Sequence, residues 1–253
     1  MTLDRRNKLA QILVSEGSVK VGKLAEMFDV TTETIRKDLI YLEQEGIAKK
    51  GHGGAISSGA LLERPLSIRF QENDEIKTRI AQAALELIPE KGVVILDAGS
   101  TTYSIAKLLT LSHGLTIITN SAPIPPMFAN TDNTVYALGG ELRGTSVSLV
   151  GMWAINTIRE IQADICFLGT DGFFDRNGPT TSAYAEAEVK KAMIQSSRKV
   201  AVVCDSRKFQ ASAMIQFCTW TEVDYLITDK GAEAENEVLQ TLKKSTDVIM
   251  VSD

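Results

Sequence analysis

Apolar residues in the first 60 positions follow two kinds of pattern. Within residues 5–13, 19–28 and 30–42 they stand three or four positions apart, so each set shares one face of a helix. Glycines follow the first and third of these segments, as is common at helix C-termini. Residues 47–56 then form two short stretches around a glycine-rich turn, which indicates two paired strands. Three helices followed by such a hairpin predict a winged helix.

The pattern changes after residue 92. Short apolar runs, as expected of buried parallel strands, cover residues 93–96, 115–118, 134–138, 164–168, 200–203, 225–229 and 248–251. Helical patterns lie between several of these runs, and the longest is expected over residues 185–197. The prolines of residues 122–126 are expected to disrupt the helix start after the second strand. Strands that alternate with helices predict an α/β layered domain with a largely parallel sheet.

Between these two regions the pattern is broken. Ser57-Ser58-Gly59 and Pro65 interrupt any continuous helix there. We therefore expect a winged helix-turn-helix domain over residues 1–57, a linker over residues 58–74 and an α/β domain over residues 75–253.

Composition restricts the class of protein. The chain has 253 residues, of which 44% are apolar and 23% are charged, as in ordinary globular proteins. No apolar run approaches the roughly 20 residues needed to span a bilayer, and the N-terminus lacks an apolar export signal. Three scattered cysteines, Cys166, Cys204 and Cys218, favour buried and reduced thiols over a disulfide framework. We expect a cytoplasmic protein.

The net charge of −5 is unevenly distributed along the chain. Residues 1–60 hold nine Lys or Arg and eight Asp or Glu, whereas residues 61–253 hold 18 and 24. The basic side chains of the first part gather on the third helix and the hairpin, and local placement governs phosphate binding more than total charge does. This distribution favours operator-specific DNA binding over indiscriminate coating of DNA.

The third helix carries side chains that suit contact with DNA. Either Asp29 or Thr31 can cap it, and hydroxyl and guanidinium groups near its N-terminus can reach base edges and phosphates. The alternative is an ordinary amphipathic helix with a solvated charged face, but the adjoining helices and hairpin favour DNA recognition. The candidate DNA-binding residues are Thr31, Thr32, Thr34, Arg36 and Lys37 in the helix and Lys49, Lys50 and His52 in the hairpin.

Several short motifs occur together in the first 55 residues. They are Arg5-Arg6, Leu24-Ala25, Val30-Thr31, the run from Thr34 to Leu39, Leu42-Glu43 and His52-Gly53-Gly54-Ala55. In this order and spacing they resemble the N-terminal domain of the DeoR family of bacterial regulators of sugar metabolism. The family usually has Ser where Thr31 stands and Arg where Lys37 stands, and both departures are mild. The resemblance implies a DNA-binding transcription regulator.

Polar residues gather where the predicted strands end. Gly99-Ser100-Thr101-Thr102 lies between a buried strand and a helix start, where backbone N–H groups and hydroxyls can hold a phosphate or another anion. A well-capped loop would explain one such cluster. Several predicted strands end in this way, however, and ligands of open α/β sheets bind outside the carboxyl ends of the strands. We therefore expect a ligand site at this edge of the sheet.

The second domain also resembles the DeoR family. The motifs are Asp97–Thr102, Thr119–Ser121, Gly139-Gly140 with Arg143, Gly169–Gly172, Glu186–Lys190, and Asp205-Ser206 with Lys208-Phe209. The resemblance implies the fold of ribose-5-phosphate isomerase, glucosamine-6-phosphate deaminase and the CoA transferases, with a phosphorylated sugar or related metabolite as effector. It implies that Ser100, Thr101 and Thr102 hold the phosphate with Lys208. The sugar hydroxyls would meet Asp97, Asn120, Asp171 and Lys190. The complete set of candidate effector-binding residues is Asp97, Gly99, Ser100, Thr101, Thr102, Asn120, Ser121, Gly139, Gly140, Arg143, Asp171, Gly172, Glu188, Lys190, Asp205 and Lys208.

Together these expectations describe a repressor of a carbohydrate-utilisation operon that a phosphorylated sugar releases from its operator. The expected partners are double-stranded operator DNA, the effector, and further copies of the chain in a dimer or tetramer, since symmetric half-sites need two reading heads. No cofactor and no metal are expected, because His52 and His113 lack a metal-ligand spacing.

The alternative is a sugar-phosphate isomerase- or deaminase-like enzyme with an attached DNA-binding domain. Asp97, Asp171, Glu186 and Glu188 could supply its acid and base. Beside a helix-turn-helix, binding without turnover is the more economical interpretation.

Overall fold

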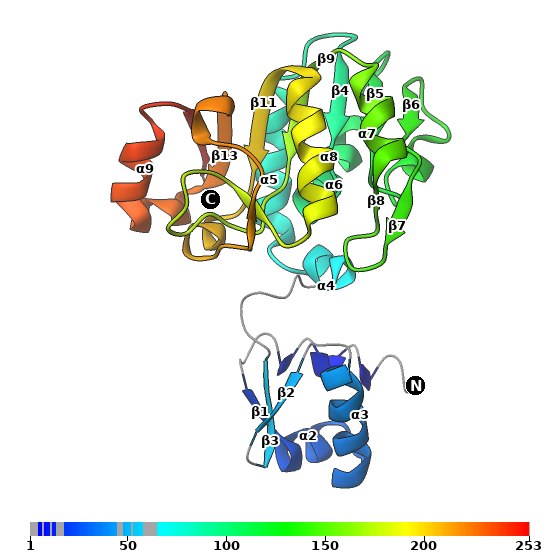
Figure 1. Cartoon of the computed structure of the whole chain (residues 1–253), viewed down its shortest axis with the longest axis vertical. Coiled ribbons are helices and arrows are strands. Elements are labelled where there is room, and N and C mark those ends of the chain that lie inside the picture. Colours follow the sequence, from blue (N-terminus) through cyan, green and yellow to red (C-terminus); the bar gives the residue numbers. More distant parts are fainter. Residues whose placement is uncertain are drawn as a thin grey trace. The chain divides into compact units, whose positions relative to one another are not determined.

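The chain forms two compact units, Met1–Leu62 and Glu63–Asp253, which we treat separately (Figure 1). The structure is a computed structural model that describes residues 5–6, 8–10, 12–13, 18–44, 48–51, 53–57 and 65–252. The second unit begins with a short helix, α4 (Leu66–Gln71), inside the stretch where the sequence predicts a linker. No helix among the residues described is long and apolar enough to cross a membrane.

The first unit is a winged helix, as predicted. The described residues between Arg5 and Leu13 are helical. The elements that follow are α2 (Val21–Met27), α3 (Thr32–Gln44) and an antiparallel sheet in the order β1 (Ser18–Lys20), β3 (Gly54–Ser57), β2 (Ala48–Gly51). Its core is formed by apolar side chains from every one of these segments, including Leu9, Leu13, Leu24, Ile35, Leu39, Leu42, Ala48 and Ala55.

The start of the second helix differs from the prediction. We expected it at Val19, but Ser18–Lys20 is a strand that pairs with β3, with Val19 opposite Ala55, and the helix begins at Val21. The β-branched Val19 is buried in this pairing. The partner of β1 lies far along the chain, so local periodicity carries no signal of this strand. The predicted helix start at Val19 was wrong for this reason.

Gly54 lets β3 lie against β1. A Cβ atom added to Gly54 would stand 1.8 Å from the carbonyl oxygen of Val19. We expect Gly54→Ala to push the two strands apart and to lower the stability of the first unit by about 1–3 kcal/mol, the usual cost of overpacking. Thermal unfolding followed by circular dichroism measures this. Gly22→Ala is the matched control, because a Cβ there meets nothing within 4 Å and Ala favours a helix. Equal melting temperatures for the two variants would contradict the close approach.

The second unit is built on a seven-stranded sheet in which every pair of neighbours is parallel (Figure 1). From one edge to the other the strands are β14 (Asp247–Val251), β13 (Tyr225–Asp229), β11 (Ser197–Val203), β9 (Ala163–Leu168), β4 (Val93–Leu96), β5 (Thr116–Thr119) and β6 (Thr134–Ala137). The chain runs from β4 outward to β6, and then returns to β9 on the other side of β4. The order therefore reverses between β4 and β9, and this is the position where open α/β sheets bind ligands.

Helices cover both faces of the sheet. They are α5 (Asp74–Leu85), α6 (Ser100–Leu109), α7 (Met152–Arg159), α8 (Tyr184–Gln195) and α9 (Asn236–Leu242). Val94 and Leu96 of β4 pack with α5 and α6 on one face, whereas Ile95 belongs to the cluster formed with α7, α8 and α9 on the other. This alternation follows from the two-residue period of a strand. The predicted α/β class with a parallel sheet is thus confirmed.

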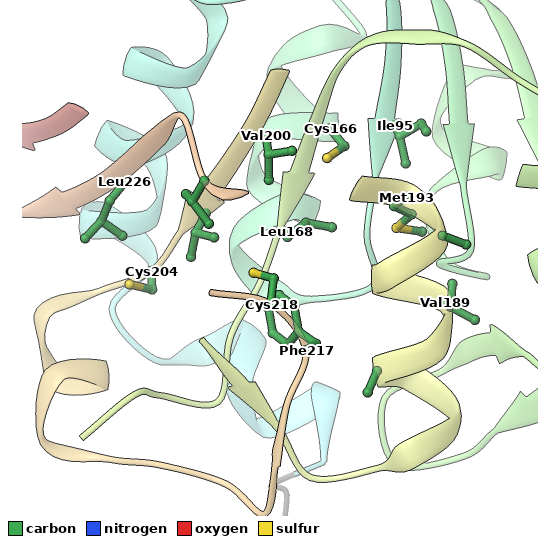
Figure 2. Packing of buried hydrophobic residues seen from close by; sticks show 14 of the residues in the cluster. Ile95, Cys166, Leu168, Val189, Met193, Val200, Cys204, Phe217, Cys218 and Leu226 are labelled. Atoms are coloured by element: carbon green, nitrogen blue, oxygen red, sulfur yellow. The ribbon is translucent and has the colours of Figure 1, made fainter. Parts of the chain in front are cut away.

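The cysteines belong to the second of these cores. Figure 2 shows Cys166, Cys204 and Cys218 among the apolar side chains of that cluster. All three are buried free thiols, and burial raises the pKa of Cys166 to about 12. The thiols therefore stay protonated, and the interpretation of these residues as core residues is confirmed.

Several elements were not predicted. They are the hairpin of β7 (Glu141–Arg143) and β8 (Ser148–Val150), helix α7, the ribbon of β10 (Thr180–Thr181) and β12 (Ile215–Gln216), helix α9, and the short 3₁₀ helices η2 (Ser206–Gln210), η3 (Trp220–Glu222) and η4 (Lys230–Glu235). The strand β11 begins at Ser197, where the sequence predicts the end of a helix. As predicted, the prolines after β5 leave only the 3₁₀ turn η1 (Pro125–Phe128).

Candidate functional site

The N-terminus of α3 is capped by one of the two residues proposed from sequence. The backbone N–H of Thr34 donates to Oγ1 of Thr31 over 3.2 Å. Asp29 instead occupies the left-handed region, with φ 49°, and forms the turn before the helix. Capping by Thr31 fixes the first turn of α3, the part of a recognition helix that meets base edges.

The candidate DNA-binding side chains of α3 lie on its accessible faces. Thr31, Thr32, Arg36 and Lys37 are exposed and Thr34 is partly exposed, whereas Ile35 is fully buried. Arg36 pairs with Glu33 over 3.4 Å, and because both side chains are largely exposed this contact is weak and easily exchanged for a phosphate or base.

The hairpin supplies the other candidates. Lys49 and Lys50 lie on β2, which pairs with β3 as expected of a wing. His52 lies outside the described residues.

Asp38 holds the first helix against α3. Its Oδ2 accepts from Nε of Arg5 over 2.7 Å, and its Oδ1 accepts from Nε of Arg6 over 2.8 Å. The Arg6 guanidinium also lies 4.1 Å above the ring of Tyr41. Only 2% of the Asp38 side chain is exposed, so this is a buried carboxylate neutralised by two cations. The Arg5-Arg6 motif therefore orients α3.

In the second unit, an ion pair occupies the point where the strand order reverses. Asp97 follows β4, Gly169 follows β9, and Lys190 reaches them from α8. Lys190 Nζ donates to Asp97 Oδ2 and, over 2.9 Å, to the carbonyl oxygen of Gly169, while the Gly169 N–H donates to Asp97 Oδ2 over 3.1 Å. Both charged side chains are at most 5% exposed. The pair thus ties α8 to the ends of the two central strands.

The ammonium group of Lys190 has little hydrogen-bonding capacity left for a ligand. Besides its two oxygen acceptors, the ammonium lies 5.1 Å from the centre of the Phe217 ring, which occupies its remaining side. Burial opposes its charge, but the carboxylates of Asp97 and Glu186 outweigh burial and hold the pKa of Lys190 above its ordinary value. Lys190 therefore stays charged and acts as a positioning residue.

Glu186, one turn before Lys190 on α8, is the centre of a hydrogen-bond network with four other side chains. Its Oε1 accepts from Arg143 Nη1 over 3.2 Å and from Ser148 Oγ over 2.9 Å, and its Oε2 accepts from Thr181 Oγ1 over 3.1 Å. Ser146 joins through hydrogen bonds to Arg143 and Ser148. The network fastens the β7–β8 hairpin to α8 beside the Asp97–Lys190 pair.

Glu188, the candidate predicted from sequence in this helix, lies away from the Asp97–Lys190 pair. Glu188 pairs with Lys191 over 2.9 Å on the outer side of α8. Residues 186 and 190 share a helical face and residue 188 does not, because four residues make about one turn. Glu186 replaces Glu188 in the candidate site.

Two polar atoms at the end of β5 point to a missing partner. Asn120 and Ser121 are each 1% exposed, and among the residues that the structure describes, Asn120 Oδ1 and Ser121 Oγ have no hydrogen-bond partner. Ser121 also forms a β-bridge with Ser148 of the hairpin, so both residues border the Glu186 network. Buried polar groups are rarely left unpaired, so these two atoms distinguish the end of β5 from the satisfied Glu186 network beside it.

The loop Gly99–Thr102 lies before α6, as predicted, and its side chains have different roles. The hydroxyl of Thr102 donates to the carbonyl oxygens of Asp97 and Gly99, over 2.6 and 3.0 Å, so it shapes the loop. Ser100 and Thr101 stand in the first turn of α6, where unpaired N–H groups and the helix dipole favour an anion.

The remaining candidates are spread over the same edge of the sheet. Asp171 accepts from the Ser182 N–H over 2.9 Å, and Asp205 accepts from the backbone and guanidinium of Arg207. Lys208, partly buried, lies in η2 after β11. Gly140 and Gly172 have positive φ and allow close backbone approach: an added Cβ would stand 2.3 Å from Val150 O and 2.1 Å from Ala211 O, respectively. Gly139 is exposed beside Gly140.

These features define a class of protein. A winged helix with an exposed, capped recognition helix is joined in one chain to a parallel α/β unit. That unit has polar side chains gathered at the switch point of its sheet. No group of His, Cys, Asp and Glu suited to a metal ion occurs in the described part of the chain. The combination is that of a ligand-responsive transcription regulator.

Comparison with known families gives the particular family. Residues 5–59 match the DeoR-like helix-turn-helix domain, and residues 72–230 match the DeoR C terminal sensor domain. The second match alone spans more than half of the chain. The chain belongs to the DeoR family of DNA-binding transcription regulators, and the sequence-based assignment is confirmed.

The chain matches its relatives over nearly their full length. It is 32% identical to the transcriptional repressor AccR of Agrobacterium fabrum, over 94% of this chain and 93% of the relative. It is 30% identical to the glycerol-3-phosphate regulon repressor of Escherichia coli K12, over 89% and 90%, and to the regulator GlpR of Haloferax volcanii, over 92% of each.

Solved structures share only parts of the chain. A ribose-5-phosphate isomerase in complex with phospho-erythronic acid has 19% sequence identity and a TM-score of 0.40, over 53% of each chain. RipA from Yersinia pestis has 11% identity and a TM-score of 0.44, over 70% of this chain and 51% of that one.

Proposed function

We propose that this protein represses a carbohydrate-utilisation operon and is released from its operator by a phosphorylated sugar or related metabolite. The effector binds at the edge of the sheet where β4, β5 and β9 end. The observation that carries this proposal is the pair of unpartnered buried atoms, Asn120 Oδ1 and Ser121 Oγ, close to the anion-favouring start of α6. Hydroxyl groups of a sugar or polyol satisfy both atoms. The name of the glycerol-3-phosphate regulon repressor, a relative, supports the same class of effector.

The roles of the other residues follow from their contacts. Ser100 and Thr101, with Lys208, contact the phosphate, and Asn120, Ser121 and Asp171 contact the hydroxyls. Asp97 and Lys190 support the site from within the fold, because they are paired with each other. On α3, Thr31, Thr32, Thr34, Arg36 and Lys37 contact operator DNA, together with Lys49, Lys50 and His52 of the wing.

The protein binds its effector without turnover in this proposal. An isomerase needs a carboxylate free to take a proton from the sugar carbon. Here each of the four carboxylates already has a donor. Asp97 is paired with Lys190, and Glu186 accepts from Arg143, Ser148 and Thr181. Asp171 accepts from the Ser182 N–H, and Glu188 is paired with Lys191. We further propose a cytoplasmic dimer or tetramer that binds a palindromic or repeated operator, since two-fold half-sites need two reading heads.

A thermal-shift screen tests the proposal. A ligand that binds only the native state raises the melting temperature as its concentration exceeds its Kd. We expect one phosphorylated sugar or polyol to raise the melting temperature and its unphosphorylated form to leave it unchanged. Asn120→Leu should abolish this shift but keep the stability of the free protein, because it removes an acceptor that has no partner. A shift by free sugars alone would exclude the phosphate assignment of residues 99–102.

A further inference from the structure

Helix α4 is the first element that the structure describes after residues 58–64, the stretch that joins the two units. It has six residues, and its apolar side chains Leu66 and Ile68 are buried in the second unit. A helix this short is not stable alone, because the cost of its first turn is not recovered over so few residues. Its position therefore depends on its contacts.

The N-terminal end of α4 is bound to the β7–β8 hairpin. The Leu66 N–H donates to the carbonyl oxygen of Thr145 over 2.9 Å. Thr145 stands in the turn between the two strands, next to Ser146. Farther along α4, the Phe70 ring packs at 4.4 Å, centre to centre, on Tyr103 of α6.

Lys77 of α5 holds the C-terminal end of α4. Its side chain is 3% exposed, and its Nζ donates to the carbonyl oxygens of Arg69 and Glu72. A cation at this end of a helix also matches the negative pole of its dipole. Burial lowers the pKa of Lys77 to about 8. Arg207, which holds Asp205, approaches Glu72 with an Nη2–Oε2 distance of 3.7 Å.

Besides α5, three segments near α4 belong to the proposed effector site or border it. The hairpin carries Ser146 and Ser148, which join the Glu186 network. Helix α6 begins with the anion-favouring turn, and η2 carries Lys208. A ligand that draws these segments together changes the anchor points of α4 at both ends, and in sequence α4 is the first described element after the DNA-binding unit.

We propose that α4, anchored by Lys77, transmits effector binding to the N-terminal unit. This deepens the proposed function and rests on it for the identity of the ligand. Polar contacts hold the two ends of α4 and apolar contacts lie between them, so a change at either end moves the helix as a body. Lys77 is then a positioning residue for regulation and contacts neither DNA nor effector.

Hydrogen–deuterium exchange on the full-length chain tests the physical link without any ligand. Lys77→Met removes both hydrogen bonds to α4 and keeps an apolar stem of similar length. We expect amide exchange at residues 66–71 to become about tenfold faster or more, as for the loss of bonds from a charged donor. Exchange at residues 143–148 should also become faster. Lys244→Met, at an exposed lysine after α9, is the matched control and should change neither segment.

Faster exchange confined to residues 66–71 would overturn the proposal, since α4 would then move without affecting the site. If Lys77→Met does not fold, Tyr103→Leu replaces it, because this change removes the ring contact with Phe70 and leaves Lys77 in place. The same two segments are measured, and the same outcomes decide.

The second arm adds three probes: inorganic phosphate, glycerol 3-phosphate and ribose 5-phosphate. A probe that slows exchange at residues 99–102 occupies the site, and residues 66–71 should then change as well. Protection of residues 99–102 with unchanged exchange in α4 would overturn the coupling and leave the effector site intact. If no probe protects residues 99–102, the proposed phosphate effectors fail, and the Lys77→Met comparison alone decides whether α4 is linked to the hairpin.

Discussion

Replacing Lys190 by Met should destabilise the second unit by about 3–5 kcal/mol, the usual cost of removing one partner of a buried ion pair. The carboxylate of Asp97 would remain buried with only the Gly169 N–H as a donor to its Oδ2. Urea denaturation of the full-length protein, followed by circular dichroism, measures the loss as a lower midpoint. A change below about 1 kcal/mol would show that the pair is accessible to water.

The double variant Asp97→Asn with Lys190→Met provides the control for this prediction. It removes both charges and keeps an oxygen acceptor for the Gly169 N–H, so most of the stability should return. The structure also changes what Asp97→Ala should do. The burial of Lys190 predicts that Asp97→Ala, which leaves the ammonium without its carboxylate, destabilises the second unit to a similar extent and does not merely remove a ligand contact.

Replacing Asp38 by Ala should abolish operator binding although Asp38 does not face DNA. The change leaves the Arg5 and Arg6 guanidinium groups without their shared carboxylate, at a cost of about 3–5 kcal/mol. This is comparable with the whole stability of a unit of this size. Hydrogen–deuterium exchange over residues 18–44 should reach the rate of an unfolded chain, and mobility-shift titration with an operator obtained by in vitro selection should show no complex.

Arg36→Ala separates loss of fold from loss of contact. Arg36 is exposed and has only a weak pair with Glu33, so its removal should leave exchange over residues 18–44 unchanged and still remove operator binding. Normal exchange in Asp38→Ala would contradict the role of Asp38 in holding the first helix against α3. A normal mobility shift in Arg36→Ala would contradict the assignment of α3 as recognition helix.

Local patterns in the sequence were sufficient for much of the fold. The parallel strands are continuous apolar runs because they are buried on both faces, and α3 has a clear apolar face with a capping residue. The strand β1 and the β7–β8 hairpin were missed because both are held by partners distant in sequence: β1 pairs across the unit with β3, and the hairpin is tied to α8 through Glu186. Neither carries a long enough periodic pattern of its own.

The candidate site was predicted from the strand ends, and a ligand site at this edge of the sheet stays a prediction. Polar residues at the strand ends do meet at one edge, because the carboxyl ends of parallel strands lie together there. Glu188 was selected from a motif, although helical spacing from Lys190 already pointed to Glu186. The ion pair between Lys190 and Asp97 could not be predicted from the sequence, since the two residues are 93 positions apart.

The polar residues at the switch point have two separate roles, and this separation bears on how such a protein can diversify. The Asp97–Lys190 pair satisfies its own charges and supports the ends of β4, β9 and α8, so it is tied to the fold whatever molecule is bound. Asn120 and Ser121 hold no neighbour through their unpaired atoms. Their side chains can be exchanged for others of similar size at little cost to folding. Duplicated copies of such a gene can therefore change the polar residues at the end of β5 while the Asp97–Lys190 pair beneath them stays unchanged.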